Sequence, residues 1–573
     1  MTALLTDNLP LLAGAPNGIK KLRELILELA VRGKLVPQDP SDEPASELLK
    51  RIAEEKARLV AEGKIKKQKP LAEIAEEEKP FELPTGWEWA STATLALLIT
   101  DGTHHTPTYV SSGVPFISVK DIDGATISFD SCKYISQEEH AAINSRCNPE
   151  RGDILLCRIG TLGRPTIVDT EVPFSLFVSV GLLKLPKKTE FSRYFHCVLS
   201  SPLMYRQYDQ IKAGGSHTNK LNLGDIPRLL APVPPLAEQH RIVAKVDELM
   251  ALCDRLEAQQ ADAESAHAEL VQALLDSLTQ ARDVNDLAAS WQRLAEHFHT
   301  LFTTESSIDA LKQTLLQLAV MGKLVPQDST DEPASELVKR IQAEKQRYLA
   351  ESKARKQKDL ASESLPEYPY EVPVGWQWQN IDDVLHVTGG VTLGRKLGDR
   401  RLVSKPYLRV ANVQRGYLEM AQIKEVEVPE EEVEKYLLRN GDLLITEGGD
   451  WDKVGRTAIW NEELPECLHQ NHVFRGRSVI TDWEPRWAEM YLNSASARDY
   501  FAGSSKQTTN LASINMTQLR ACAFPLPPLA EQHRIVAKVD QLMALCNQLK
   551  TRLTQARQLN EQLASTLVEQ AVA

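Results

Sequence analysis

The chain contains two copies of one sequence, and this duplication limits the folds available to it more than any other feature. The segment PPLAEQHRIVAKVD occurs at residues 234–247 and again at 527–540, and LMALC follows shortly after both. GKLVPQD likewise occurs at 33–39 and 322–328. Repeated segments of this kind are expected to adopt the same local structure. The sequence therefore predicts a pseudo-two-fold tandem repeat whose halves share one frame.

Between the repeated motifs lie two blocks, residues 90–231 and 379–523, that differ in sequence. They share a similar length and a Gly-Asp pair at a predicted strand start (Asp153 and Asp442). A nearly identical frame around unlike inserts predicts that the frame binds one partner twice and that the inserts recognise two different things. Alternatively, the frame packs against itself, although packed cores usually tolerate volume-conserving substitution. The expected order is an N-terminal helical segment, a first insert domain, a central repeated helical region, a second insert domain and a C-terminal repeated helix, at 1–80, 81–233, 234–372, 373–526 and 527–573.

Each PPLAEQ motif is followed by apolar residues at alternating steps of four and three, which predicts a long helix with one buried stripe. Roughly 45 residues of helix would extend ~68 Å and would need a partner for the stripe. We expect the two copies to pair as an antiparallel coiled coil. The expected seam residues are Ile242, Val246, Leu249, Cys253 and Leu256 in the first copy, and Ile535, Val539, Leu542, Cys546 and Leu549 in the second. The predicted stripe then continues through Gln260, Ala263, His267, Leu270 and Leu274, and through Leu553, Ala556, Asn560, Leu563 and Leu567.

Two shorter helices are expected ahead of each insert. Apolar residues from Ile19 to Leu29 predict an amphipathic helix, and the corresponding residues of the second copy predict the same. A second, highly charged helix is expected to begin with Asp42 as its N-cap and Pro44 in its first turn. It ends in a lysine-rich run, residues 64–69, which is either a solvated helix end or a contact for phosphates or a partner.

Composition narrows the class of protein. The 573 residues have a formal net charge of −12, and most of the excess acid lies in the predicted frame helices. The eight cysteines form no C-x-x-C pair, which favours free thiols in a reducing cytoplasm. No run of apolar residues is long enough to span a bilayer. In the second insert the cationic residues are expected in loops away from the acids at 430–434, giving a locally positive face: Arg395, Lys396, Arg400, Arg401, Arg475 and Arg477.

A Pro-x-Gly-Trp opening at 84–87 and 373–376, a variable block, then PPLAEQ-x-RIV and a long helix, all twice, resembles the specificity subunit of Type I restriction-modification systems. The long segment before each Gly-Trp resembles the larger members of that family. The resemblance implies an α+β fold with two α/β target recognition domains separated by long helices that form an antiparallel coiled coil. It implies that each domain reads one half of a bipartite duplex DNA target and that the helices set the spacing.

The resemblance also implies partners and a division of labour. Two methyltransferase subunits dock on the frame and modify adenine with S-adenosylmethionine, and restriction subunits add an ATP-dependent endonuclease in the bacterial cytoplasm. The chain itself would be non-catalytic and would bind no cofactor or metal, with S-adenosylmethionine, ATP and Mg²⁺ on the partners. A coiled-coil scaffold with two protein-binding lobes is the alternative.

Motifs for chemistry are weak. The chain has no Asp/Asn-Pro-Pro-Tyr/Phe loop, and GGVTLGRK at 389–396 lacks the Lys-Ser/Thr ending of a phosphate-binding loop. Cys467, His469 and His472 have metal-like spacing without a fourth ligand nearby. Asp442 with Glu447 could suggest a nuclease pair, but a residue at a strand start is the favoured interpretation.

Base reading requires polar side chains on loops that reach a groove edge. We expect roughly half of the candidates to fail, because many protein–DNA contacts go to phosphate and sugar. The DNA-binding candidates of the first insert are Thr103, His104, His105, Thr106, Lys120, Arg158, Arg164, Ser216, His217, Asn219 and Lys220. Those of the second insert are Arg395, Lys396, Arg409, Asn412, Glu447, Arg456, His472, Lys506, Thr508, Thr509 and Asn510.

Overall fold

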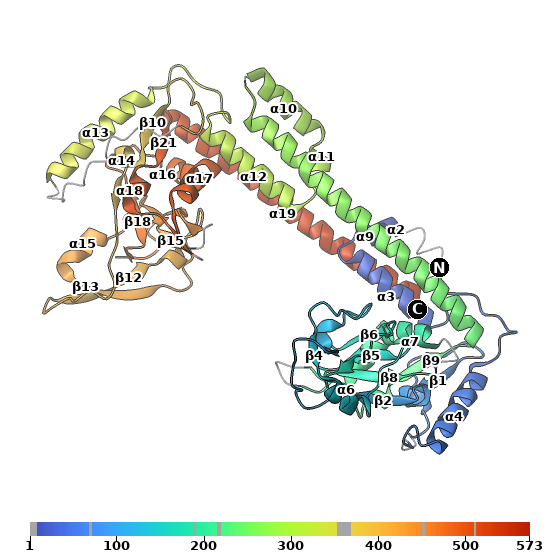
Figure 1. Cartoon of the computed structure of the whole chain (residues 1–573). Coiled ribbons are helices and arrows are strands. Elements are labelled where there is room, and N and C mark those ends of the chain that lie inside the picture. The colour runs from blue at the N-terminus through green and yellow to red at the C-terminus, as the bar shows by residue number, and fades with distance from the viewer. Residues whose placement is uncertain are drawn as a thin grey trace. The chain divides into compact units, whose positions relative to one another are not determined.

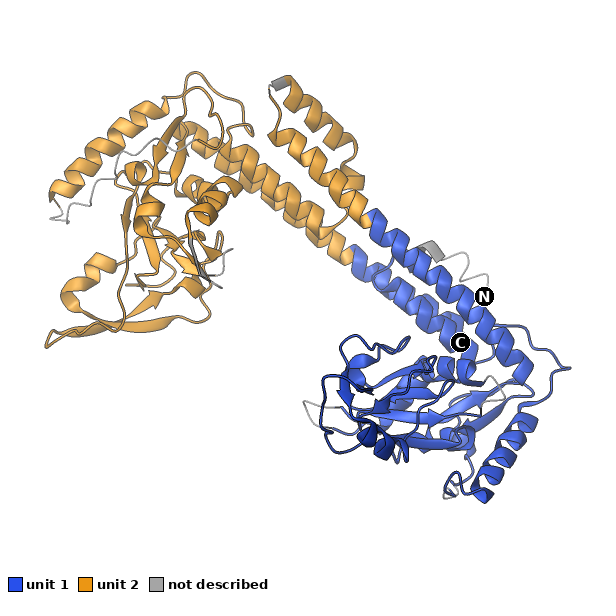
Figure 2. Ribbon diagram, viewed as in Figure 1, with its two compact units in different colours: residues 1–263, 556–573 blue, residues 264–555 orange. Residues whose placement is uncertain are grey.

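The computed structural model describes residues 9–67, 71–186, 191–214, 219–282, 284–351, 368–449, 453–508 and 511–572. The chain forms two compact units, residues 1–263 with 556–573 and residues 264–555 (Figure 2). Two 44-residue helices, α9 (Leu236–Thr279) and α19 (Leu529–Val572), each begin in one unit and end in the other. Each unit therefore contains one insert domain, the first part of one long helix and the last part of the other.

The insert domain of unit 1 is built on a four-stranded antiparallel sheet with strand order β2-β8-β5-β6 and a three-stranded sheet with order β4-β3-β7 (Figure 1). Only the β3–β7 pair is parallel among the strands of these two sheets. The strands are β2 (Leu98–Asp101), β3 (Val114–Ile117), β4 (Lys133–Ile135), β5 (Ile154–Cys157), β6 (Gly163–Ile167), β7 (Ser175–Leu176) and β8 (Val180–Lys184). The helices are α5 (Thr92–Leu95), α6 (Gln137–Asn144), α7 (Phe191–Leu199) and α8 (Pro202–Ile211).

The insert domain of unit 2 repeats this topology, with strand orders β11-β18-β14-β16 and β13-β12-β17. An extra small sheet, β15-β20-β19, follows β14. The strands are β11 (His386–Thr388), β12 (Leu402–Leu408), β13 (Lys424–Pro429), β14 (Leu443–Thr446), β15 (Gly448–Gly449), β16 (Thr457–Ile459), β17 (Leu468–His469), β18 (Val473–Arg477), β19 (Lys506–Thr508) and β20 (Leu511–Ser513). The helices are α14 (Ile381–Val384), α15 (Val433–Tyr436), α16 (Pro485–Asn493), α17 (Ala495–Ser504) and α18 (Met516–Arg520). Unlike sequences thus form one fold.

A short strand pair closes each insert onto the frame. In unit 1, β1 (Glu88–Ser91) pairs antiparallel with β9 (Leu230–Val233). In unit 2, β10 (Gln377–Asn380) pairs in the same way with β21 (Ala523–Leu526). The closing strand leads through Pro-Pro into the long helix, because proline cannot continue the ladder but is tolerated in the first turn of a helix. The start of each insert is therefore held beside its end.

The repeated motifs meet in the same buried contacts in both units. The Trp87 indole N–H donates to the Glu238 carboxylate at 2.9 Å, and Gln38 donates to the same carboxylate at 2.6 Å. In unit 2, Trp376 donates to Glu531 at 2.9 Å. Burial raises the pKa of Glu238, against the hydrogen bond from Trp87, which lowers it. Internal packing therefore accounts for the identity of these buried residues.

The helices before the inserts are α2 (Leu9–Gly14), α3 (Gly18–Val31) and α4 (Ala45–Ala61) in unit 1, and α10 (Val284–Glu296), α11 (Phe298–Leu301), α12 (Glu305–Val320) and α13 (Ala334–Glu351) in unit 2. The prediction that Asp42 caps α4 is wrong. Pro44 is the N-cap residue, and Asp42 instead forms an ion pair with Arg241 of α9 at 2.5 Å. Asp331 and Arg534 form the matching pair.

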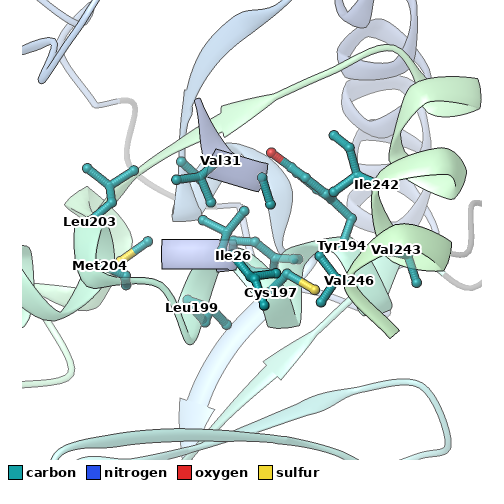
Figure 3. Packing of buried hydrophobic residues seen from close by; sticks show 14 of the residues in the cluster. Ile26, Val31, Tyr194, Cys197, Leu199, Leu203, Met204, Ile242, Val243 and Val246 are labelled. Atoms are coloured by element: carbon teal, nitrogen blue, oxygen red, sulfur yellow. The ribbon is translucent and has the colours of Figure 1, made fainter. Parts of the chain in front are cut away.

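The long helices pack in three-helix groups rather than as an isolated pair. In unit 1, α3 lies between them: Lys21 donates to Ser565 of α19, Lys34 donates to the Val572 carbonyl, and Arg23 pairs with Glu257 of α9. Ile26 and Val31 of α3 pack with Ile242 and Val246 of α9 and with α7 in one core (Figure 3). In unit 2, α12 occupies the equivalent place. In unit 1, α19 is parallel to α3, whereas α9 is antiparallel to α3. The two long helices are therefore antiparallel to each other there.

The ten seam residues named from the sequence are buried or half-buried. The continuation of the stripe is wrong at Ala263, Ala556, Leu270 and Leu563, which are exposed, whereas Leu274, Leu553 and Leu567 are half-buried against the cores. Val271, Leu275 and Leu278 face the core of unit 2 instead, and Ala564 and Ala571 face that of unit 1. Between Cys253 and Val271 every residue of α9 is exposed or half-buried, so no continuous buried stripe joins the two ends of the helix. His267, expected in the seam, donates from Nε2 to the Thr300 carbonyl at 3.0 Å.

Candidate nucleic-acid interface

Four segments of the first insert domain meet at one edge of its four-stranded sheet. The loop after β2 pairs with the β7–β8 turn through Thr103, whose carbonyl accepts from the Val178 N–H at 3.0 Å. The loop after β5 pairs with residues 219–220, since Gly160 N–H donates to the Asn219 carbonyl at 2.9 Å. The structure thus brings together the candidates at 103–106, 158 and 219–220. Ser216 and His217 lie outside the described residues.

Glycine permits the close approach of these loops. A Cβ on Gly102 would lie 2.0 Å from the Leu176 carbonyl oxygen at the end of β7. At the corresponding place in unit 2, a Cβ on Gly390 would lie 2.0 Å from the His469 carbonyl oxygen at the end of β17. Gly390 of GGVTLGRK therefore serves a backbone crossing that the first domain shares.

Arg158 is buried beneath this edge, with a side-chain exposure of 3%. Its guanidinium pairs with Asp101, and it also donates to the Val178 carbonyl at 3.0 Å and the Leu221 carbonyl at 3.2 Å. Asp101 additionally accepts from Arg146 at 3.1 Å. The prediction that Arg158 contacts DNA is therefore wrong, because its side chain is buried and ties the loops together.

The other candidates of the first domain remain at the surface, except Thr103. His104 and His105 are two-thirds exposed; His104 bonds Asp101 at 3.0 Å and His105 bonds Glu139 at 2.6 Å. Thr103 is buried and holds the His105 ring at 2.7 Å. The candidates that are exposed without an assigned structural role are Thr106, Lys120, Arg164, Asn219 and Lys220.

The second insert domain places its loops at the same edge. Glu447 N–H donates to the His472 carbonyl at 2.9 Å, and the Asn471 N–H donates to the Val391 carbonyl at 3.0 Å. The Glu447 carboxylate and the His472 ring form a pair at 2.5 Å. Lys506 and Thr508 lie in the adjacent strand β19, although their side chains are outside the described part, as are Thr509 and Asn510 altogether.

The expected positive face of the second domain is not formed as predicted. Arg395 and Arg400 pair with Glu432 at 2.5 and 2.8 Å, and Arg401 pairs with Glu430 at 3.0 Å. The acids that the sequence placed elsewhere are brought beside these arginines by the β12–β13 hairpin. Lys396 stays exposed.

Several other cations of the second domain serve its fold. Arg475 and Arg477 lie in strand β18 rather than in a loop, and both donate to the Leu437 carbonyl at 2.9 Å. Burial lowers the pKa of Arg475 to about 10. Arg477 also pairs with Asp442 at 2.6 Å. Neither Arg475 nor Arg477 therefore lies on the loops that meet at the edge of the sheet.

Arg409, Asn412 and Arg456 are also held internally. Asn412 is buried and accepts from the Arg409 N–H at 3.0 Å, so it caps a short turn. Arg409 donates to the Gln422 carbonyl at 3.0 Å, and Arg456 donates to Gln414 at 2.6 Å. For Asn412 the prediction of a DNA contact is wrong, because its amide is enclosed.

The metal and nuclease patterns do not assemble. His469 is buried with its Nδ1 on the Val473 carbonyl at 2.7 Å, whereas His472 turns to Glu447. Burial lowers the pKa of His469 to about 3. Asp442 pairs with Arg477 and Asp153 with Lys184, as strand-start residues. Among the described residues, no three metal-ligating side chains gather.

Comparison with known proteins decides the family. A family model described as the Type I restriction modification DNA specificity domain matches residues 104–264 and 373–557. The chain is 39% identical over 582 residues to the Type I restriction enzyme EcoAI specificity subunit of Escherichia coli, covering 97% of this chain and 94% of that protein. The chain belongs to the family of Type I restriction-modification specificity subunits. Two further relatives of this specificity subunit are the EcoEI subunit of Escherichia coli (36% identity, 97% and 94% covered) and the EcoKI subunit of Escherichia coli strain K12 (24%, 85% and 89%).

The two matched regions give this specificity subunit two DNA recognition domains, one in each unit. We call them recognition domains 1 and 2, and we call the edge where the loops of each domain meet its reading edge. In the described part of the chain, no helix combines the length and the apolarity needed to cross a bilayer.

Proposed function

We propose that this specificity subunit reads a bipartite duplex DNA target, with one recognition domain on each half-site. The supporting observation is that both domains bring equivalent loops to the same edge of the same sheet while the exposed side chains on those loops differ. Sequence is read by side chains that reach base edges, so two unlike sets on one scaffold suit two unlike half-sites.

We also propose that two modification (methyltransferase) subunits bind the repeated frame. Residues that the two copies share and bury, such as Trp87 and Glu238, are explained by packing. Ala237 and Ala244 are exposed on α9, as are Ala530 and Ala537 on α19, and their identity has no such explanation. A partner that binds this surface of α9 and the matching surface of α19 would account for the identity of these exposed alanines.

In this proposal the chain supplies specificity and no chemistry. The methyltransferase subunits would bind S-adenosylmethionine and modify adenine, and restriction subunits would bind ATP and Mg²⁺, in the bacterial cytoplasm where the DNA lies. This chain would bind no cofactor itself.

The test exchanges residues 379–523 for the corresponding insert of another family member and measures the methylated sequence of a reconstituted complex. We expect one half-site to change and the other half-site and the gap to stay. A change in both halves would contradict the modular assignment. A wild-type complex without preference for any bipartite sequence would favour a protein-binding scaffold instead.

A further inference from the structure

Glu447 and His472 occupy fixed backbone positions on the reading edge of recognition domain 2. Glu447 follows β14 directly, and His472 precedes β18. The Glu447 N–H donates to the His472 carbonyl at 2.9 Å, and the Glu447 carbonyl accepts from the Ile514 N–H at 2.9 Å. The backbone of Glu447 is therefore held on both sides, which fixes the place from which its side chain projects.

The two side chains present a combined polar surface. Glu447 Oε2 and His472 Nδ1 are 2.5 Å apart, and the side chains are 29% and 55% exposed. This contact leaves Glu447 Oε1 as an acceptor and His472 Nε2 as the second hydrogen-bonding group of the ring. Because Nδ1 carries the proton that it donates to the carboxylate, Nε2 is a donor only when both ring nitrogens are protonated, and in that form the pair offers one acceptor and one donor.

Recognition domain 1 has different chemistry at the same place. The backbone bond from Glu447 to His472 corresponds to the one from Arg158 N–H to the Ser179 carbonyl, at 3.0 Å. There the side chain is a buried arginine that ties loops together. The Glu447–His472 side-chain pair is therefore not part of the shared fold, although backbone pairing holds the corresponding loops in both domains.

A carboxylate on a DNA-facing edge is repelled by phosphates, so its favourable contact is an amino group on a base. Adenine presents an N6 amino donor beside the N7 acceptor in the major groove, which matches an acceptor beside a donor. Guanine presents two acceptors there, and thymine presents an acceptor and a methyl group, so both would face the carboxylate with the wrong group. Cytosine presents an N4 amino group, the usual partner of a carboxylate, but no acceptor beside it on the same base for a donor from His472.

We propose that Glu447 and His472 read one adenine in the half-site of recognition domain 2, with Glu447 Oε1 accepting from N6 and His472 Nε2 donating to N7. This inference rests on the proposed function and deepens it.

The experiment uses the full chain reconstituted with its methyltransferase subunits. Methylation is measured on duplexes randomised one position at a time, and then on duplexes in which the identified adenine is replaced by purine, which lacks the N6 amino group, or by 7-deazaadenine, which lacks N7. The variants are Glu447→Ala, Glu447→Gln and His472→Ala. The control is Glu466→Gln, which removes an exposed charge paired with Lys405 at 2.5 Å on the β12–β17 side of the same domain.

We expect Glu447→Ala to lose about 10-fold or more of the preference for adenine at one position of one half-site, and to become insensitive to loss of N6. His472→Ala should become insensitive to loss of N7. Glu447→Gln should retain the preference, because a glutamine amide also matches adenine. The control should behave as the wild type.

Several results would overturn the inference. They are an unchanged base preference in Glu447→Ala, a loss spread over both half-sites, or analogue effects that are the same in the variants and the wild type. If instead the wild-type complex shows no bipartite preference, the proposed function fails as well, so the two failures are distinguishable.

Discussion

At the scale of single residues, recognition domain 2 contains two buried histidines that resist protonation. Burial, helped by the nearby charge of Arg475, lowers the pKa of His386 to about 4 and that of His469 to about 3. An unfolded histidine titrates near 6.5. The unfolded chain therefore binds more protons than the folded chain between pH 6.5 and 4, and the stability that neutral histidines allow is lost as the pH falls through that window.

We expect the free energy of unfolding of unit 2 to fall by about 2 kcal/mol per histidine between pH 7 and pH 5. Denaturant titrations followed by tryptophan fluorescence would measure this, because unit 1 contains only Trp87 and Trp89 of the nine tryptophans. His469→Asn, whose amide can still donate to the Val473 carbonyl, should show about half the pH slope. An unchanged slope in this variant would contradict the assignment.

At the scale of elements, the reading edge of recognition domain 1 depends on one arginine that joins four segments of chain. Arg158 follows β5 and bonds Asp101 of β2, Val178 before β8 and Leu221 in the loop before β9. A planar guanidinium can reach several acceptors at once, whereas a lysine ammonium is a single point charge on a flexible stem. The Val178 and Leu221 carbonyls would lose their hydrogen-bond donor if the guanidinium of Arg158 were removed.

Arg158→Lys should therefore lower the free energy of unfolding of unit 1 by about 1–3 kcal/mol. In the reconstituted complex it should also relax base preference in the half-site of recognition domain 1 and leave the other half-site unchanged. Chemical denaturation and methylation of randomised duplexes measure the two effects. Arg151→Lys is the matched control, since Arg151 is exposed just before β5, forms an exposed ion pair with Glu171 at 3.5 Å and is not a DNA-binding candidate. An unchanged base preference in Arg158→Lys would show that the loops keep their positions without the guanidinium of Arg158.

At the scale of the whole molecule, the sequence predicted what repetition and local pattern determine. It predicted the duplicated frame, the long helices and the burial of residues such as Ile242 and Cys253. It did not predict contacts between distant segments: Arg158 and Asp101 are 57 residues apart, and Arg395 and Glu432 are 37 apart. From sequence alone, a charged residue is expected to face solvent. Only the fold shows whether an oppositely charged side chain pairs with it. The predicted coiled-coil stripe was wrong in the middle of the two long helices, because part of their buried surface packs against α3 and α12 near the helix ends.

The exposed middle of each long helix gives a way to test whether the helices set the distance between half-sites. The units meet along the chain at Ala263 in α9 and Gln555 in α19, at equivalent places in the repeat. Seven residues inserted after both positions add ~10 Å of helix, which is about three base pairs at 3.4 Å each. Because seven residues are nearly two full turns, the buried stripes beyond the insertion turn by only ~20°.

We expect the reconstituted complex to methylate a target whose gap is longer by about three base pairs, with both half-sites unchanged. Insertion into one helix alone should abolish methylation, since the stripes of the two helices would no longer match. Methylation of duplexes with graded gap lengths measures the outcome. An unchanged gap in the double insertion would mean that elements other than α9 and α19 fix the spacing.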